Sequence, residues 1–303
     1  MAAWDRLSGR ADVTFYNDHV TGDALIRRLQ PYTILVVMRE RTPLPRTLIS
    51  RLPNLRLIVT AGWRNRAIDL TACRDHGVIV CGTETGSSPT AELAFGLILA
   101  LTRHVVAEDR ALREGRWQTK LGFALKGKKL GILGLGRLGG RVATYAQAFG
   151  MEVIAWSQNL TDARAAELGC RRVDKDTLFG TADVVSLHLL LSERSRGIVG
   201  TRELALMKPG AFIVNTARAA LIDQDALVAA LKAGTIAGAA LDVYDQEPLP
   251  PDASILTAPN TILTPHLGYA TSDSYQTYFP QILEDIEAWL AGEPVRVIGE
   301  ATV

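Results

Sequence analysis

Short apolar runs alternate with helix-like amphipathic segments along the first third of the chain. The runs are rich in Val, Ile and Leu, which is typical of buried strands, and the segments between them have apolar residues at helical spacing. Because strands joined through helices run parallel, this alternation predicts a parallel α/β sheet. The strand-like runs cover residues 11–17, 33–39, 55–62 and 77–83, and the helix-like segments cover residues 24–29, 45–52 and 69–76.

A second strand–helix series follows a long apolar segment at 89–117, which predicts one continuous helix. A final helix with apolar residues at helical spacing is expected at 275–292, packed back on the first part of the chain. We therefore expect two domains, residues 1–93 with 275–303 and residues 94–274 between them. The six strand-like runs of the second series, enough for a complete dinucleotide-binding sheet, are KLGILGLG, MEVIAWS, DVVSLHLL, AFIVNTA, IAGAALDVY and TILTPH.

The composition is that of a globular protein, with 303 residues, 48% hydrophobic and 21% charged, and a formal net charge of +1. This charge balance provides no global field toward nucleic acid or an acidic membrane. The three cysteines lack the spacing of metal ligands, which fits a reducing compartment and predicts no metal site. The first residues have no apolar signal segment, and the run at 92–101 is too short to span a membrane. We expect a soluble cytoplasmic protein.

A glycine-rich turn follows the first strand of the second series and opens a helix. Gly134, Gly136 and Gly139 have the spacing G-x-G-x-x-G, with Arg137 and Leu138 between the last two. The first glycine permits a tight turn, the second lets the backbone approach a pyrophosphate, and the third lets helix and strand pack closely. The helix N-terminus offers N–H groups and a positive dipole end to phosphates. The turn therefore predicts a dinucleotide site.

The next strand lacks the acid that usually accompanies such a turn. Proteins that bind NAD carry an Asp or Glu about 20 residues on, at the end of the second strand, which binds the adenosine ribose. Here the strand ends in Trp156, followed by Ser157, Gln158 and Asn159. These polar groups can hydrogen-bond a 2′-phosphate or a free ribose, and no carboxylate repels the phosphate. The sequence favours NADP, or tolerance of NADP and NAD, with Arg164 as a further candidate contact.

Three polar residues of the second half each follow a strand-like run. They are Arg218, Glu247 and His266, and the carboxyl ends of parallel strands are where such sheets bind ligands. Arginine binds carboxylates with a forked, permanently charged group. Histidine exchanges a proton near neutral pH, and a neighbouring glutamate favours imidazolium. This set suits the reduction of a 2-oxo acid by hydride transfer.

The same segments resemble the D-2-hydroxyacid dehydrogenase family, which includes glyoxylate/hydroxypyruvate reductases and phosphoglycerate dehydrogenases. The resemblance covers most of the chain and implies a Rossmann-type doubly wound sheet inserted into a smaller flavodoxin-like α/β substrate domain. It also implies a homodimer packed through the cofactor domain. The motifs that carry it, in family order, are LGILGLGRLGG, DVVSLHLL, MKPGAFIVNTARAALID, AALDVYDQEP and TPHLGY.

The resemblance implies roles for matching positions. Arg218 would hold the substrate carboxylate and polarise the carbonyl, His266 would be the acid/base, and Glu247 would hydrogen-bond His266. Backbone N–H groups of a loop would also bind the substrate carboxylate, and the candidates for this loop are Gly62, Trp63 and Arg64. Further implied cofactor contacts are Thr216 and Ala217 beside the nicotinamide and Asp242 at its carboxamide. Gly268 is a further candidate contact, and His188 is expected either beside the cofactor or as a buried structural histidine.

Three departures from the family pattern bear on these expectations. The family usually opens with a strand that residues 1–93 are expected to lack. Arg64 replaces the second glycine of the substrate loop, and Trp63 and Arg64 would narrow the mouth of the site or add a positive charge. Ala219 replaces the glycine after the catalytic arginine. Two alternatives stay open: a phosphoglycerate dehydrogenase, and a non-catalytic dinucleotide sensor that binds partner peptides as a corepressor does.

Overall fold

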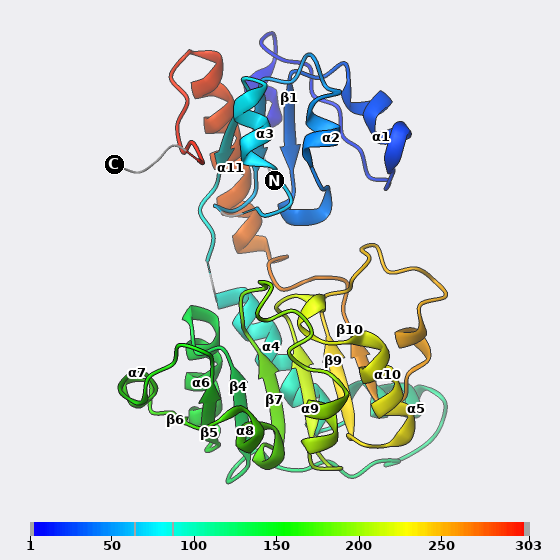
Figure 1. Cartoon of the computed structure of the whole chain (residues 1–303). Helices are drawn as coiled ribbons and strands as arrows, with labels where there is room; N and C mark the ends of the chain where they lie inside the picture. Colours follow the sequence, from blue (N-terminus) through cyan, green and yellow to red (C-terminus); the bar gives the residue numbers. More distant parts are fainter. Residues whose placement is uncertain (1–2, 64, 87, 300–303) are drawn as a thin grey trace. The chain divides into compact units, whose positions relative to one another are not determined.

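The computed structural model describes residues 3–63, 65–86 and 88–299. The chain forms two compact units, one made of Met1–Gly86 with Thr271–Val303 and the other of Ser87–Ala270. The second unit is an insertion between the two parts of the first, and each unit has its own parallel sheet (Figure 1). The expected α/β class, with one domain inserted into a smaller one, is confirmed.

The first unit is built on a three-stranded parallel sheet with the order β1-β2-β3. Every residue of the central strand β2 is buried, because helices hide both faces of a parallel sheet. Apolar side chains of the sheet, α1, α2 and α3 form one core. The elements are η1 (Trp4–Leu7), α1 (Gly22–Leu29), β1 (Ile34–Val37), η2 (Arg39–Arg41), α2 (Arg46–Ile49), β2 (Leu57–Thr60), α3 (Leu70–Asp75), β3 (Ile79–Gly82) and α11 (Ser272–Leu290).

The prediction of a strand at 11–17 is wrong, because this segment has no strand pairing in the structure. Its apolar side chains instead contact nearby aromatic rings. The Phe15 ring lies edge-on to Trp4, at 5.4 Å between centroids, and Tyr16 lies edge-on to Tyr32 at 6.2 Å. Phe15 stays 61% exposed. An alternating pattern therefore formed local ring contacts rather than a sheet.

The segment after α11 returns to the first sheet, and α11 itself contacts β2 and β3, as expected for the last helix. Val297 forms an antiparallel bridge with Cys81 of β3.

The Arg296 guanidinium donates to Asp285 Oδ1 and to Glu284 Oε2, at 2.9 Å each. Asp285 is fully buried, and its Oδ2 has no hydrogen-bond partner among the described residues. Burial raises the pKa of Asp285 to about 7, against the opposing effect of Arg296.

The second unit has seven parallel strands in the order β10-β9-β8-β7-β4-β5-β6. The order reverses at β4, the point where doubly wound sheets bind ligands beside the strands' carboxyl ends. Helices α4 and α6 pack in one core, and α8, α9 and α10 pack in another on the opposite face (Figure 1). Six strands match the runs expected from the sequence. The seventh, β6, has two residues, too few to form a pattern.

The elements of this unit, after α4 and α5, have the following bounds. The strands are β4 (Lys129–Leu133), β5 (Glu152–Trp156), β6 (Arg171–Arg172), β7 (Val184–Leu187), β8 (Phe212–Asn215), β9 (Gly238–Leu241) and β10 (Thr261–Leu263). The helices are α6 (Arg137–Ala148), α7 (Asp162–Glu167), α8 (Lys175–Thr181), α9 (Thr201–Leu206), η3 (Ala219–Leu221), α10 (Gln224–Ala233) and η4 (Ser254–Thr257).

The prediction of a single helix at 89–117 is wrong. The structure has two helices there, α4 (Ser88–Thr102) and α5 (Val105–Arg113), with a bend of 58° between them. His104 has a φ of +53° at the break. The backbone of Gly122 lies against the end of α4, where a Cβ would stand 2.3 Å from Thr102 O. Within the described residues no single helix is long and apolar enough to cross a membrane, and the bent pair α4–α5 reaches that length and composition only with both helices counted.

Candidate functional site

The glycine turn lies between β4 and α6. Gly134 has a φ of +101°, and its N–H donates to Trp156 O at 2.8 Å. A Cβ on Gly134 would stand 2.8 Å from the carbonyl carbon of His188, and a Cβ on Gly139 would stand 2.1 Å from Gly134 O. A Cβ on Gly136 would meet no heavy atom within 4 Å. The open side of Gly136, at the N-terminus of α6, fits the approach of a pyrophosphate.

The strand next to the glycine turn ends without an acid. β5 ends at Trp156; Ser157 is half-buried and residues 158–159 are exposed. Arg164, the further candidate contact, pairs with Glu167 at 2.7 Å within α7. The strand end therefore presents neutral polar groups and no negative charge of its own.

His188 follows β7 beside the glycine turn. Its backbone N–H donates to Leu133 O at 2.8 Å, and its ring Nε2 forms a hydrogen bond with Ser186 Oγ at 2.9 Å. Burial lowers the pKa of His188 to about 4, so the ring is neutral at pH 7. A neutral, hydrogen-bonded ring suits a wall of the dinucleotide site better than proton transfer.

The turn after β8 is held by the buried side chain of Asn215. Its Nδ2 donates to Arg218 O at 2.9 Å, and its Oδ1 accepts the Ala217 N–H at 3.0 Å. The Arg218 guanidinium donates to Ala217 O at 2.7 Å. Thr216 Oγ1 is buried and has no hydrogen-bond partner among the described residues. Because a buried hydroxyl without a partner costs free energy, this atom fits contact with a bound group.

His266 follows β10 and has a φ of +54°, a region that few non-glycine residues adopt. Its Nδ1 lies 2.7 Å from Glu247 Oε2, and Tyr244 N–H donates to Glu247 Oε1 at 3.0 Å. Burial opposes ionisation of Glu247, but these hydrogen bonds and the charge of Arg218 outweigh it and lower the pKa of the carboxyl. Tyr269 lies edge-on to the imidazole, at 5.8 Å between centroids. The ionised Glu247 accepts Nδ1–H, which leaves Nε2 for proton transfer.

Asp242 is fully buried just after β9 and holds the turn that carries His266. Its Oδ1 accepts Thr264 Oγ1–H at 2.6 Å and Leu267 N–H at 2.7 Å, and its Oδ2 accepts Gly268 N–H at 2.8 Å. Burial raises the pKa of Asp242, although these three donors oppose the shift. The implied contact of Asp242 with a nicotinamide carboxamide stays a prediction.

The predicted substrate loop lies in the first unit, after β2. Gly62 has a φ of +91°, and its N–H donates to Thr83 Oγ1 at 2.8 Å, so this N–H is already used within the protein. Trp63 is 45% exposed. Arg64 lies outside the described residues.

The second unit brings its predicted residues to one edge of its sheet, because each follows the carboxyl end of a parallel strand. Gly62 and Trp63 belong to the other unit. Sequence reasoning missed the residues that hold the site together, although each is polar or aromatic and close to the end of an apolar run. They are Asn215, Tyr244, Thr264 and Tyr269.

Comparisons with known proteins agree with this geometry. The model of the NAD binding domain of the D-isomer specific 2-hydroxyacid dehydrogenases matches residues 95–268. A D-3-phosphoglycerate dehydrogenase of Archaeoglobus fulgidus is 37% identical over 90% of the chain and 52% of its own length. A hydroxypyruvate reductase of Thermotoga maritima is 36% identical over 92% of each chain.

A solved structure has the same two-domain architecture. It is a putative D-3-phosphoglycerate dehydrogenase from Ralstonia solanacearum, with a TM-score of 0.91 and 36% identity over 98% of this chain and 92% of that one. The chain spans about half the length of the phosphoglycerate dehydrogenase it matches. With the family model matched over more than half of the sequence, the chain belongs to the D-isomer specific 2-hydroxyacid dehydrogenase family.

Proposed function

We propose that this chain is an NAD(P)-dependent D-2-hydroxyacid dehydrogenase that works mainly as a 2-oxoacid reductase. The observation that carries the proposal is the 2.7 Å hydrogen bond between His266 and Glu247, on the sheet edge that also bears the glycine turn. A nicotinamide cofactor, when bound, supplies or accepts the hydride. The open side of Gly136 and the buried hydroxyl of Thr216 fit such a group.

The protein's own residues supply binding and proton transfer. Arg218 binds the substrate carboxylate with its forked guanidinium and stabilises negative charge that develops on the carbonyl oxygen. His266, held in place through Nδ1 by Glu247, gives a proton from Nε2 to that oxygen during reduction and takes it back during oxidation. Glu247 stays ionised, because its hydrogen bonds and the charge of Arg218 lower the pKa of its carboxyl.

The proposed cofactor preference is NADP, with NAD tolerated. It rests on Ser157, Gln158 and Asn159, which place polar, uncharged side chains where NAD-specific proteins carry an acid. Arg164 is engaged with Glu167, so these three side chains are the first candidates to meet a 2′-phosphate.

We also propose a homodimer formed through α5 and the segment that follows it. Three hydrogen bonds from Thr119 to Glu108 tie that segment to α5. Exposed apolar side chains gather on both: Val105, Val106, Leu112, Trp117 and Leu121, with exposed fractions of 54%, 43%, 56%, 77% and 96%. A second copy would cover them, and light scattering of the protein and of the variant Leu121→Lys tests this.

The three cysteines are free and buried, which supports the predicted cytoplasmic location.

The experiment that tests the proposal is steady-state reduction of glyoxylate, hydroxypyruvate and phosphohydroxypyruvate, each with NADPH and with NADH. Turnover of the first two supports a glyoxylate/hydroxypyruvate reductase. Turnover of phosphohydroxypyruvate alone would make the chain a phosphoglycerate dehydrogenase. Cofactor binding without turnover of any of these acids would contradict the proposal and favour the corepressor-like sensor.

A further inference from the structure

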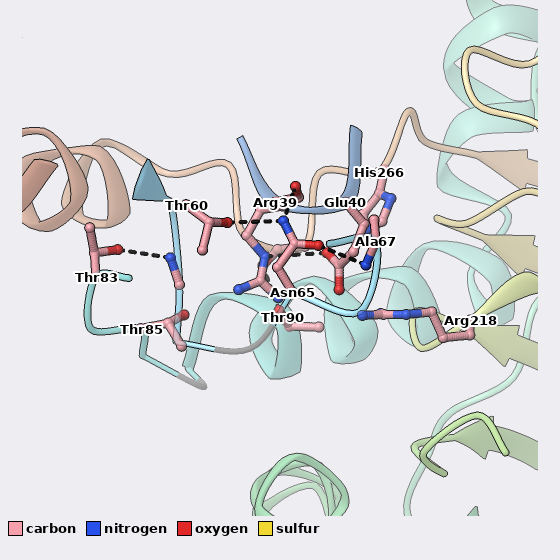
Figure 2. A network of polar contacts seen from close by, with 12 residues as sticks. Arg39, Glu40, Thr60, Asn65, Ala67, Thr83, Thr85, Thr90, Arg218 and His266 are labelled. Atoms are coloured by element: carbon pink, nitrogen blue, oxygen red, sulfur yellow. Dashed lines mark hydrogen bonds and ion pairs between the residues drawn. The ribbon is translucent and has the colours of Figure 1, made fainter. Parts of the chain in front are cut away.

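The side chain of Asn65 joins three separate parts of the first unit. Its Nδ2 donates to Arg39 O at 2.6 Å and to Thr60 Oγ1 at 2.9 Å, and its Oδ1 accepts Ala67 N–H at 2.9 Å. Figure 2 shows the amide between these partners. The contacts link the end of β1, the end of β2 and the loop itself.

One of these partners has an unusual backbone. Arg39 follows β1 with a φ of +54°, and such a conformation in a non-glycine residue persists only where its surroundings hold it. The Arg39 carbonyl that this conformation turns toward the loop is the one that accepts from Asn65. The Asn65 amide therefore holds the Arg39 turn in place.

The Arg39 turn in turn fixes the start of the loop. A Cβ on Gly62 would stand 2.0 Å from Arg39 Nη1, so the guanidinium lies directly against the open face of this glycine. The Gly62 N–H is held from another direction by Thr83 Oγ1 at 2.8 Å. The backbone that enters the loop is thus confined on two sides, and one of them depends on Asn65.

The Asn65 amide is buried, at 9% exposure, and both its donor and its acceptor groups are used. Its removal would take one hydrogen bond from the Arg39 carbonyl and one from the Ala67 N–H, and the loss of a buried hydrogen bond weakens a structure measurably. The nearest part of the chain to respond is the loop at 61–66, since Asn65 lies within it.

We propose that Asn65 is a positioning residue for the binding of the substrate carboxylate. It holds the backbone at residues 62–63 and 65–67 in one arrangement through Arg39, Thr60 and Ala67, so that this part of the chain is ordered before the substrate arrives. The inference rests on the proposed function and on the loop contact that the family resemblance implies, because it assumes a 2-oxo acid whose carboxylate also contacts backbone N–H groups after β2. It assigns no proton transfer and no cofactor contact to Asn65.

The test compares Asn65→Ala and Asn65→Asp with Asn54→Ala. Asn54 lies in the same unit, and its Nδ2 donates to Gln30 O at 3.0 Å at an exposed site. In both Asn65 variants we expect the KM for hydroxypyruvate to rise about 10-fold, the effect of losing one to two buried hydrogen bonds. We expect kcat and the Kd of NADPH to stay within about threefold of the starting protein, because the residues proposed for those steps lie in the other unit. Asn54→Ala should leave KM unchanged.

A second readout needs no turnover. Hydrogen–deuterium exchange of the peptide covering residues 57–68 should be faster in both Asn65 variants and unchanged in Asn54→Ala. An unchanged KM in both Asn65 variants would overturn the inference. A rise in KM accompanied by an equally large fall in kcat and in cofactor affinity would also overturn it. If the starting protein reduces no oxo acid, the proposed function fails; exchange that is also unchanged would then remove the positioning role separately.

Discussion

The imidazole of His266 and the carboxylate of Glu247 form a hydrogen bond of 2.7 Å from Nδ1 to Oε2, and the second carboxylate oxygen accepts Tyr244 N–H at 3.0 Å. Both oxygens of Glu247 are therefore fixed, and the imidazole has one orientation. Burial alone would favour a neutral Glu247, but its hydrogen bonds and Arg218 lower the pKa of this carboxyl. The pair is built to keep a negative charge behind a proton donor.

Replacement of this charge should slow the reaction. In Glu247→Gln the imidazole loses its hydrogen bond to a charged group, so kcat/KM for reduction should fall about 10- to 100-fold. The control Glu193→Gln changes an exposed glutamate of the same unit and should leave kcat/KM unchanged. An unchanged kcat/KM in Glu247→Gln would contradict the role of this carboxylate.

The same carboxylate affects stability at low pH. The pKa of Glu247 is lower in the folded protein than in the unfolded chain, where it is about 4.3. Its contribution to stability is therefore complete above that value and is lost as the pH falls through the folded pKa. Urea unfolding between pH 3 and pH 6 should show a smaller loss toward low pH in Glu247→Gln than in the starting protein.

Two glycines separate cofactor binding from folding. A Cβ on Gly136 would meet no heavy atom within 4 Å, so Gly136→Ala should leave the melting temperature unchanged while it fills the space left for phosphates. We expect the Kd of NADPH to rise about 10-fold or more. Gly210→Ala, also in open space, is the control and should change neither quantity. A Kd within twofold of the starting value in Gly136→Ala would place the phosphates elsewhere.

An acid at the end of β5 should reverse the proposed cofactor preference. Ser157→Asp places a carboxylate directly after Trp156, where it repels a 2′-phosphate and accepts from a free ribose. The ratio of kcat/KM for NADPH to that for NADH should fall about 10-fold or more, as for a like-charge contact at short range. Ser157→Asn adds similar bulk without charge and should change the ratio little. Equal effects of the two variants would show that size, not charge, matters there.

The buried Asp285 should make stability fall as the pH rises. Its pKa is about 7 in the folded protein and about 3.9 in the unfolded chain, so between these values the folded state binds more protons. The free energy of unfolding should therefore decrease from pH 4 to pH 7, by about 1–4 kcal/mol relative to Asp285→Asn. Glu284→Gln removes the exposed carboxylate that also contacts Arg296 and should keep the dependence. Parallel curves for the starting protein and Asp285→Asn would contradict the shift.

Much of the strand arrangement in the second unit can be predicted from the sequence. Each buried strand is a short apolar run that can be recognised by itself. The glycine turn can also be predicted from the sequence. Gly134 and Gly139 have no room for a Cβ, so the turn requires glycine at fixed spacing, and that spacing is visible in the sequence. The predictions for the segment at 11–17 and for the long helix at 89–117 are wrong because the conformation of each depends on contacts that its own sequence pattern does not specify. The first meets aromatic rings instead of a strand, and Gly122 packs against the end of α4.

The site shows the same division. Arg218, Glu247 and His266 can be predicted because each is a charged or titratable residue that follows an apolar run. Such residues lie at the carboxyl ends of parallel strands, where these sheets bind ligands. The polar residues that hold them, such as Asn215 and Asp242, act through hydrogen bonds to backbone atoms that no sequence pattern specifies. Asn65 belongs to this class, since only the folded structure places it beside the Arg39 carbonyl.

The measurement that tests the central claim most directly is kcat of His266→Ala for the best oxo acid of the panel, together with the Kd of its cofactor. Removal of the proton donor should lower kcat by roughly 10²–10⁴, and the Kd should stay within about twofold, since the glycine turn is untouched. A kcat within twofold of the starting protein would show that His266 is not the acid/base and would contradict the mechanism.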